Sequence, residues 1–210
     1  MKPYKTLIRR ASDEFCVNKS RFIGHGCPCG TEEAALSFLA ETRAAYRDAS
    51  HNCYAYIIGE NMGVMRYSDD GEPGGTAGMP IIEVLKARAV TNLCVVVTRY
   101  FGGILLGAGG LVRAYAKAAA LALDGCGVGV MHPTARYLVD VKYPMLGRLE
   151  RYLDAAPVIV EDKSFTDVVT VTYVIRCADE ERIAAEIVDL TEGDAMPLRF
   201  EELYFNWPEL

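Results

Sequence analysis

The residues best suited to chemistry lie in a glycine-rich stretch, GGILLGAGG, at residues 102–110. An apolar run precedes it and an alanine-rich run follows, so we expect a strand, a loop and then the start of a helix. Glycine allows positive φ angles and close backbone approach, and the free N–H groups at a helix start attract anions. The glycines assigned to this anion-binding loop are Gly102, Gly103, Gly107, Gly109 and Gly110.

Three cations flank the loop. Arg99 closes the preceding strand, and Arg113 and Lys117 are one helical turn apart on the helix that follows. Guanidinium and ammonium groups complement phosphate oxygens, so we predict that all three surround the loop and bind an anion such as RNA phosphate. The alternative is that they are ordinary surface residues around a packing loop.

The common nucleotide signatures do not match. Residues 102–109 have the spacing of a P-loop, but Ala108 and Gly109 stand where Lys and Ser or Thr are required. GAGGLV at 107–112 ends in Val112 rather than glycine, and no acidic residue follows at the distance expected for ribose binding. Both signatures are excluded as written.

A second unusual segment, YSDDGEPGGTAGMP at residues 67–80, combines carboxylates with turn-forming residues. Hard cations prefer carboxylate oxygens, so Mg²⁺ binding is one interpretation. A tight acidic turn whose Asp side chains bind their own backbone is the commoner arrangement. The residues of this acidic turn are Asp69, Asp70, Glu72, Gly74, Gly75 and Thr76.

Histidine and cysteine residues form two clusters in the sequence. His25, Cys27 and Cys29 alternate along an extended segment and could bind a metal, but their spacing favours a strand that ends in a turn. His51 and Cys53 share one face of a strand without an identifiable orienting group or oxyanion site. No nucleophile can be named, and a protein that is not an enzyme is favoured, with no metal or cofactor assigned.

Hydrophobic patterning positions these segments in two domains, residues 1–130 and 131–210. The boundary is placed at the glycine-dense segment 124–129. In the first domain we expect a helix over 31–47, strands over 53–58 and 93–99, a helix that begins at Pro80, and a long helix from Gly110 to about Leu123. In the second we expect strand 135–142, helix 145–155, strands 157–163 and 167–176, helix 180–191 and strand 197–206, the βαββαβ order of ferredoxin-like folds.

Composition indicates a globular chain with an uneven charge. Hydrophobic residues make up 51% and charged residues 24% of 210 residues, which excludes disorder as the main state. Residues 1–130 hold 14 basic and 12 acidic side chains (+2), whereas residues 131–210 hold 8 and 16 (−8). A polyanion would therefore bind the first half. The longest run without Asp, Glu, Lys, Arg or His is 13 residues, shorter than a membrane span, and early charges argue against a secretory signal, so we expect a cytoplasmic protein.

Four segments resemble the YigZ/IMPACT family. They are SRFIGHG (20–26), HNCYAY (51–56), YSDDGEPGGTAGMPI (67–81) and TRYFGGILLGAGGLVRAY (98–115), and the βαββαβ tail is similar to the carboxy-terminal domain of bacterial YigZ-type members. The resemblance implies an α+β first domain like the second domain of a small-subunit ribosomal protein and domain four of elongation factor G. It implies a ferredoxin-like second domain.

The resemblance also implies a link to translation, because eukaryotic IMPACT relatives regulate initiation through a ribosome-associated activator of an initiation-factor kinase. That partner does not transfer directly, since this chain lacks the RWD domain of those proteins. The preferred interpretation is a translation-linked regulatory protein that binds RNA, the ribosome or a translation-associated protein, with its oligomeric state undetermined. The alternatives are a phosphate- or nucleotide-binding enzyme with Mg²⁺ at Asp69, Asp70 or Glu72, and a protein-docking module.

Overall fold

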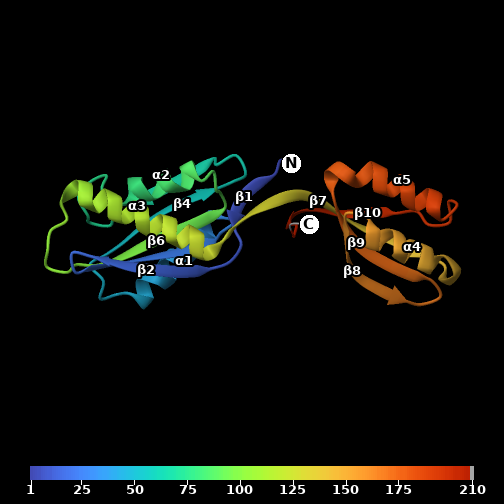
Figure 1. Ribbon diagram of the computed structural model, residues 1–210, viewed down its shortest axis with the longest axis horizontal. Helices are drawn as coiled ribbons and strands as arrows, with labels where there is room; N and C mark the ends of the chain where they lie inside the picture. Colours follow the sequence, from blue (N-terminus) through green and yellow to red (C-terminus); the bar gives the residue numbers. More distant parts are fainter. Residues whose placement is uncertain (209–210) are drawn as a thin grey trace. The chain divides into compact units, whose positions relative to one another are not determined.

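The computed structural model describes residues 1–208 and divides the chain into two compact units. One unit is Tyr4–Val130, and the other contains Met1–Pro3 and the chain from Met131 onward. Each unit has an antiparallel sheet of its own, and the described chain holds five α-helices (Figure 1). The expected α+β class, with a ferredoxin-like second domain, is confirmed.

The first unit is built on a sheet with the strand order β2-β3-β6-β4-β5. Every neighbouring pair is antiparallel. β2 and β3 are joined by a two-residue turn in which Asn18 and Lys19 both have positive φ. A turn of this type matches the right-handed twist of the two strands that it joins. The strands of this sheet are β2 (Ala11–Val17), β3 (Ser20–Pro28), β4 (His51–Ile58), β5 (Val64–Ser68) and β6 (Leu93–Tyr100). The first strand of the chain, β1 (Tyr4–Leu7), is not part of this sheet and pairs with β7 (Val128–Val141).

Helices cover both faces of this sheet, as Figure 1 shows. α2 (Gly78–Ala87) and α3 (Gly107–Cys126) lie on one face, where α3 packs on β2 and β3 and α2 packs on β4 and β5. α1 (Glu32–Ala45) lies against β4 and β6 on the other face, and the Thr31 side chain caps it by accepting a hydrogen bond from the N–H of Ala34. Central strands are therefore buried on both sides, which explains their continuous apolar runs.

Small residues let α3 approach the sheet closely. Its alanines at 114, 118, 119 and 122 are all buried. A Cβ atom added to Gly24 of β3 would lie 2.2 Å from the carbonyl oxygen of Ala118, and one added to Gly26 would lie 2.5 Å from Sγ of Cys126. The glycines of β3 are therefore required by the position of α3 on this sheet.

The second unit has the strand order β10-β7-β9-β8, all antiparallel. In chain order these are the fourth, first, third and second strands, the arrangement of a ferredoxin-like βαββαβ domain. Leu149 and Leu153 of one helix and Ile183 and Ile187 of the other belong to its apolar core. The elements are β7 (Val128–Val141), α4 (Tyr143–Ala155), β8 (Val158–Phe165), β9 (Val169–Arg176), a short 3₁₀ turn, α5 (Glu180–Leu190) and β10 (Leu198–Asn206).

Three expected boundaries differ in the structure. α3 begins three residues earlier than expected, at Gly107, and α2 begins at Gly78, two residues before Pro80. β7 begins at Val128, so most of the glycine-dense segment 124–129 belongs to α3 or β7 and does not form a loop. Gly127, with φ of 70°, ends α3 and turns the chain directly into the strand.

Candidate functional site

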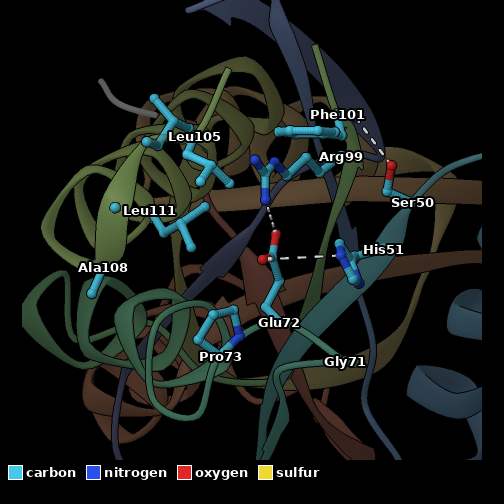
Figure 2. Close-up of a pocket in the computed structure, with 12 residues that line it drawn as sticks. Ser50, His51, Gly71, Glu72, Pro73, Arg99, Phe101, Leu105, Ala108 and Leu111 are labelled. Atoms are coloured by element: carbon cyan, nitrogen blue, oxygen red, sulfur yellow. Dashed lines mark hydrogen bonds and ion pairs between the residues drawn. The ribbon is translucent and has the colours of Figure 1, made fainter. Parts of the chain in front are cut away.

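A cavity of about 510 Å³ opens in the first unit beside the glycine-rich loop. Its wall combines the start of β4, the acidic turn, the end of β6, the loop 101–106 and the first turns of α3. Figure 2 shows Glu72, Arg99 and His51 on one side of this cavity and Leu105, Ala108 and Leu111 on the other. Polar groups thus lie against one wall of a cavity that is otherwise apolar.

A buried ion pair forms the polar wall. Nη1 of Arg99 donates a hydrogen bond of 2.6 Å to Oε1 of Glu72, and the Tyr115 hydroxyl donates another of 2.6 Å to the same oxygen. The side chains of Glu72 and Arg99 are only 3% and 6% exposed. A buried charge is tolerated only when it is paired and hydrogen-bonded, and these contacts meet that condition. Burial also raises the pKa of Tyr115 far above its usual range, so its hydroxyl remains a donor.

His51 completes the polar wall. Its Nδ1 donates to the backbone oxygen of Asp70 at 2.8 Å, which leaves Nε2 directed toward the carboxylate of Glu72. Nε2 is 3.9 Å from Oε2 of Glu72, beyond hydrogen-bond distance. Within residues 1–208, Oε2 of Glu72 and Nε2 of His51 both lack a hydrogen-bond partner, and so does the buried Nε of Arg99.

Apolar side chains complete the cavity. The guanidinium carbon of Arg99 lies 5.4 Å from the ring centroid of Phe101, which is itself 49% exposed. Leu105 is 83% exposed on the same loop, and Leu111 closes the inner end. α3 begins here without a side chain that caps its first N–H groups. An exposed apolar rim around buried polar groups is typical of a ligand cavity.

Arg113 and Lys117 lie beside a second hollow, a groove of about 350 Å³. Both side chains are exposed, and Nζ of Lys117 lies 4.3 Å from the ring centroid of Phe15 on β2. No acidic side chain within residues 1–208 forms an ion pair with either of them. Leu106 lines both the groove and the cavity, so the two hollows adjoin at the start of α3.

The structure corrects the prediction that three cations surround one loop. Arg99 is buried and points to Glu72, whereas Arg113 and Lys117 face the neighbouring groove. The difference arises because Arg99 lies in the central strand β6, both faces of which are covered. Sequence distance to the loop could not reveal which of the three cations would be buried and which exposed.

The glycines of the loop serve several purposes. The N–H of Gly102 donates to Oγ of Ser20, and a Cβ there would lie 2.0 Å from the carbonyl carbon of Lys19. Gly102 is thus required for close packing, and its amide is not free for an anion. Gly103 and Gly107 have positive φ, and of the five only Gly107 lines the cavity, while Gly110 lines the groove and Gly109 lies in α3 near Arg113.

The carboxylates of the acidic turn are bound by protein donors. Asp69 accepts hydrogen bonds from the N–H groups of Gly75, Ala77 and Gly78, and so caps the start of α2. Burial alone would raise the pKa of Asp69, but these three donors outweigh it and hold the pKa below its usual range.

The other two carboxylates of the turn also have protein partners. Asp70 pairs with Arg43 at 2.6 Å and accepts from the N–H of Asn52, and Glu72 pairs with Arg99. In the described part of the chain no three His, Cys, Asp or Glu residues are grouped to hold a metal. Of the remaining turn residues, the Thr76 hydroxyl donates to the backbone oxygen of Pro73, and Gly74 has open space around it.

Three members of the histidine and cysteine clusters, His25, Cys29 and Cys53, are buried. His25 is buried between the hydroxyls of Ser12 and Thr98, and burial, with a contribution from Arg10, lowers its pKa to about 4. Burial raises the pKa of Cys29 and of Cys53 to about 12, so both thiols stay protonated at neutral pH. A protonated thiol is a poor nucleophile and a poor metal ligand.

Sequence reasoning missed the group formed by Glu72, Arg99 and Tyr115. The three residues lie in the acidic turn, β6 and α3, and the first two are 27 positions apart in the sequence. It also missed Phe15, whose ring contacts Lys117. No local spacing marks such a group, because separate elements bring its members together only after folding.

These features define an α+β protein of two units, whose first unit has a cavity with one polar wall and an adjoining basic groove. The chain belongs to the IMPACT family. The Impact N-terminal domain matches residues 18–123, and a domain of unknown function, DUF1949, matches residues 139–194. The predicted family is thereby confirmed.

Several relatives cover most of the chain. IMPACT family member YvyE of Bacillus subtilis (strain 168) is 37% identical over 90% of this chain and 88% of its own. IMPACT family member YigZ of Escherichia coli (strain K12) is 33% identical over 89% and 92%. A crystal structure of a hypothetical protein, 30% identical, superposes with a TM-score of 0.62 over 96% of this chain and 98% of that one.

Eukaryotic relatives share a smaller part. The Protein IMPACT homolog of Saccharomyces cerevisiae is 31% identical over 46% of this chain and 39% of its own. Separately, none of the helices within residues 1–208 has both the length and the apolar character needed to cross a membrane.

Proposed function

We propose that the protein is a translation-linked regulatory protein that binds RNA or the ribosome through the groove beside Arg113 and Lys117. The observation that carries the proposal is that two exposed cations, one turn apart on α3, have no acidic partner within residues 1–208. Most other arginines and lysines of the first unit pair with carboxylates, for example Arg10 with Glu41 and Arg43 with Asp70. The positive charge of an unpaired cation is not neutralised by a neighbouring carboxylate, so it can attract a phosphate group.

An aromatic ring and the charge distribution support the same function. Phe15 lies under Lys117 and lines the groove, and aromatic rings beside basic side chains are typical of surfaces that bind single-stranded nucleic acid. The excess of acidic residues lies in 131–210, which leaves the first unit as the part of the chain suited to a polyanion. Membership of the IMPACT family favours a regulatory role in translation over an unrelated one.

The test is a filter-binding titration of the full chain against purified ribosomes and a structured RNA at several salt concentrations. We expect binding to weaken steeply between about 50 and 200 mM salt, because phosphate contacts release counterions. Arg113→Ala and Lys117→Ala should each reduce the slope of log K against log salt by about 1.

Arg47→Ala is the matched control, since Arg47 is also exposed, forms no ion pair within residues 1–208, and lies in the turn after α1 rather than on α3. Its slope should equal that of the wild type. An affinity that does not change with salt, or equal slopes in all four proteins, would contradict the proposal. A protein partner recovered from lysate by wild type and lost with Arg113→Glu, in the absence of RNA, would instead support the protein-docking alternative.

A further inference from the structure

We propose that the cavity beside Glu72 and Arg99 binds a nucleobase. This inference deepens the proposed function and rests on it where the base belongs to an RNA strand whose phosphates contact Arg113 and Lys117. The cavity itself could also accept the base of a free nucleoside, and the experiment below separates the two sources.

The charges of the cavity favour a neutral group. Arg99 carries the positive charge that would attract a phosphate, but Glu72 neutralises it at 2.6 Å, and both side chains are almost fully buried. The free oxygen of Glu72, Oε2, would repel an anion, and Arg99 would repel a cation. The ligand that suits this wall therefore has no net charge where it meets the pair.

The hydrogen-bonding groups of the wall require a ligand with both donors and acceptors. Oε2 of Glu72 and Nε2 of His51 can accept hydrogen bonds. The guanidinium N–H groups of Arg99 other than the one bonded to Glu72 and the fully buried Nε–H can donate. Buried polar groups without partners are rare in folded proteins, and each calls for an explanation. The edge of a nucleobase presents donors and acceptors side by side, which matches this set.

The remaining walls suit a flat apolar body. Phe101 offers a half-exposed ring, and Leu105 and Leu111 face it across the cavity (Figure 2). The volume of about 510 Å³ lies within the usual range for small-molecule sites, roughly 300–1,000 Å³. Proteins hold unstacked bases by stacking them on aromatic rings while polar groups contact the base edge.

The position of the basic groove favours a base that belongs to a phosphate-bearing strand over other neutral groups. Leu106 lines both hollows, Ala108 lines the cavity, and Arg113 lines the groove. Ala108 and Arg113 are five residues apart on α3, about 8 Å along the helix axis. A base in the cavity and phosphates of the same strand at the groove can thus be bound together.

The test uses a six-nucleotide single-stranded RNA, the matching six-unit ribose-phosphate oligomer without bases, and free adenosine and guanosine. Ala108→Trp should fill the cavity without removing a core contact, because Ala108 is exposed. Val112→Trp is the matched control: it is exposed on the same helix but lines neither hollow. A thermal unfolding measurement on each variant serves to check that it folds.

For the wild type we expect the RNA to bind about 10-fold more tightly than the oligomer without bases. Ala108→Trp should remove this difference and keep the salt dependence, while Val112→Trp should behave as wild type. Equal affinity of wild type for the two oligomers, with salt dependence intact, would overturn the base site and leave the proposed function standing. Nucleosides that bind wild type but not Ala108→Trp, without any RNA binding, would support the cavity and overturn the proposed function. No binding of any probe would overturn both.

Discussion

At the scale of single residues, the site depends on one carboxylate. Glu72 receives hydrogen bonds from Arg99 and Tyr115, and its free oxygen approaches His51. Arg99 therefore stays buried only as long as Glu72 balances its charge. This dependence explains why an arginine that the sequence marks as a phosphate ligand is instead part of the cavity wall.

Glu72→Ala should lower the free energy of unfolding by about 3–5 kcal/mol, because it leaves the Arg99 charge buried without compensation. Urea denaturation measures the loss. Glu41→Ala is the matched control, since Glu41 also pairs with an arginine, Arg10, but at the surface. There we expect about 0–1 kcal/mol. Similar losses in the two variants would show that burial does not set the strength of the Glu72 pair.

At the scale of elements, α2 and α3 begin in different ways at the same site. α2 has no capping side chain at its own N-cap, Ala77, and relies on Asp69 from earlier in the acidic turn. α3 begins without any side-chain cap. The acidic turn thus positions Glu72 and stabilises α2, so both tasks depend on the fold of one short segment.

Asp69→Ala should destabilise the protein by about 1–2 kcal/mol at pH 7, the usual effect of losing a helix cap. The folded pKa of Asp69 is lowered, so its stabilisation is present above the unfolded pKa, about 4, and is lost as pH falls through the folded pKa. Urea denaturation of wild type and variant at pH 7 and about pH 3 tests this. The difference between them should shrink at the lower pH; a constant or growing difference would contradict the assignment.

At the scale of the whole molecule, each unit has a core of its own. The core beneath α2 and α3 includes Leu85, Val95 and Tyr115, and the core of the second unit includes Leu149 and Ile187. No residue belongs to both of these clusters in the described chain. The cavity and the groove are formed only by residues of the first unit. We therefore propose that the two domains respond separately to core mutations.

Leu149→Ala should cost the second unit about 2–5 kcal/mol, because it leaves a cavity in a fully buried core. In calorimetry, the part of the unfolding transition that belongs to the second unit should occur at a lower temperature than in the wild type. RNA affinity measured at about 15 °C, where the first unit is still folded, should equal that of wild type. Leu85→Ala in the first core is the counterpart and should shift the other part. A loss of RNA affinity in Leu149→Ala would contradict separate domains.

The sequence alone was sufficient for the family, the α+β class and the order of the elements in the second domain. These follow from local signals: period-two alternation at Val169, Val171 and Tyr173 predicted a strand, and the spacing of Leu146, Leu149 and Leu153 predicted a helix. Such patterns involve residues a few positions apart in the chain, so they can be recognised in the sequence without knowledge of the tertiary structure.

The contents of the site were decided only by the tertiary structure. Arg99, Arg113 and Lys117 look equivalent in the sequence, but β6 turns the first inward to Glu72 and α3 turns the other two outward. Asp69, Asp70 and Glu72 look like one acidic cluster, but each meets a different donor from a different element. Partners of this kind are set by long-range packing, because the field that a charged side chain experiences depends on what folding places beside it.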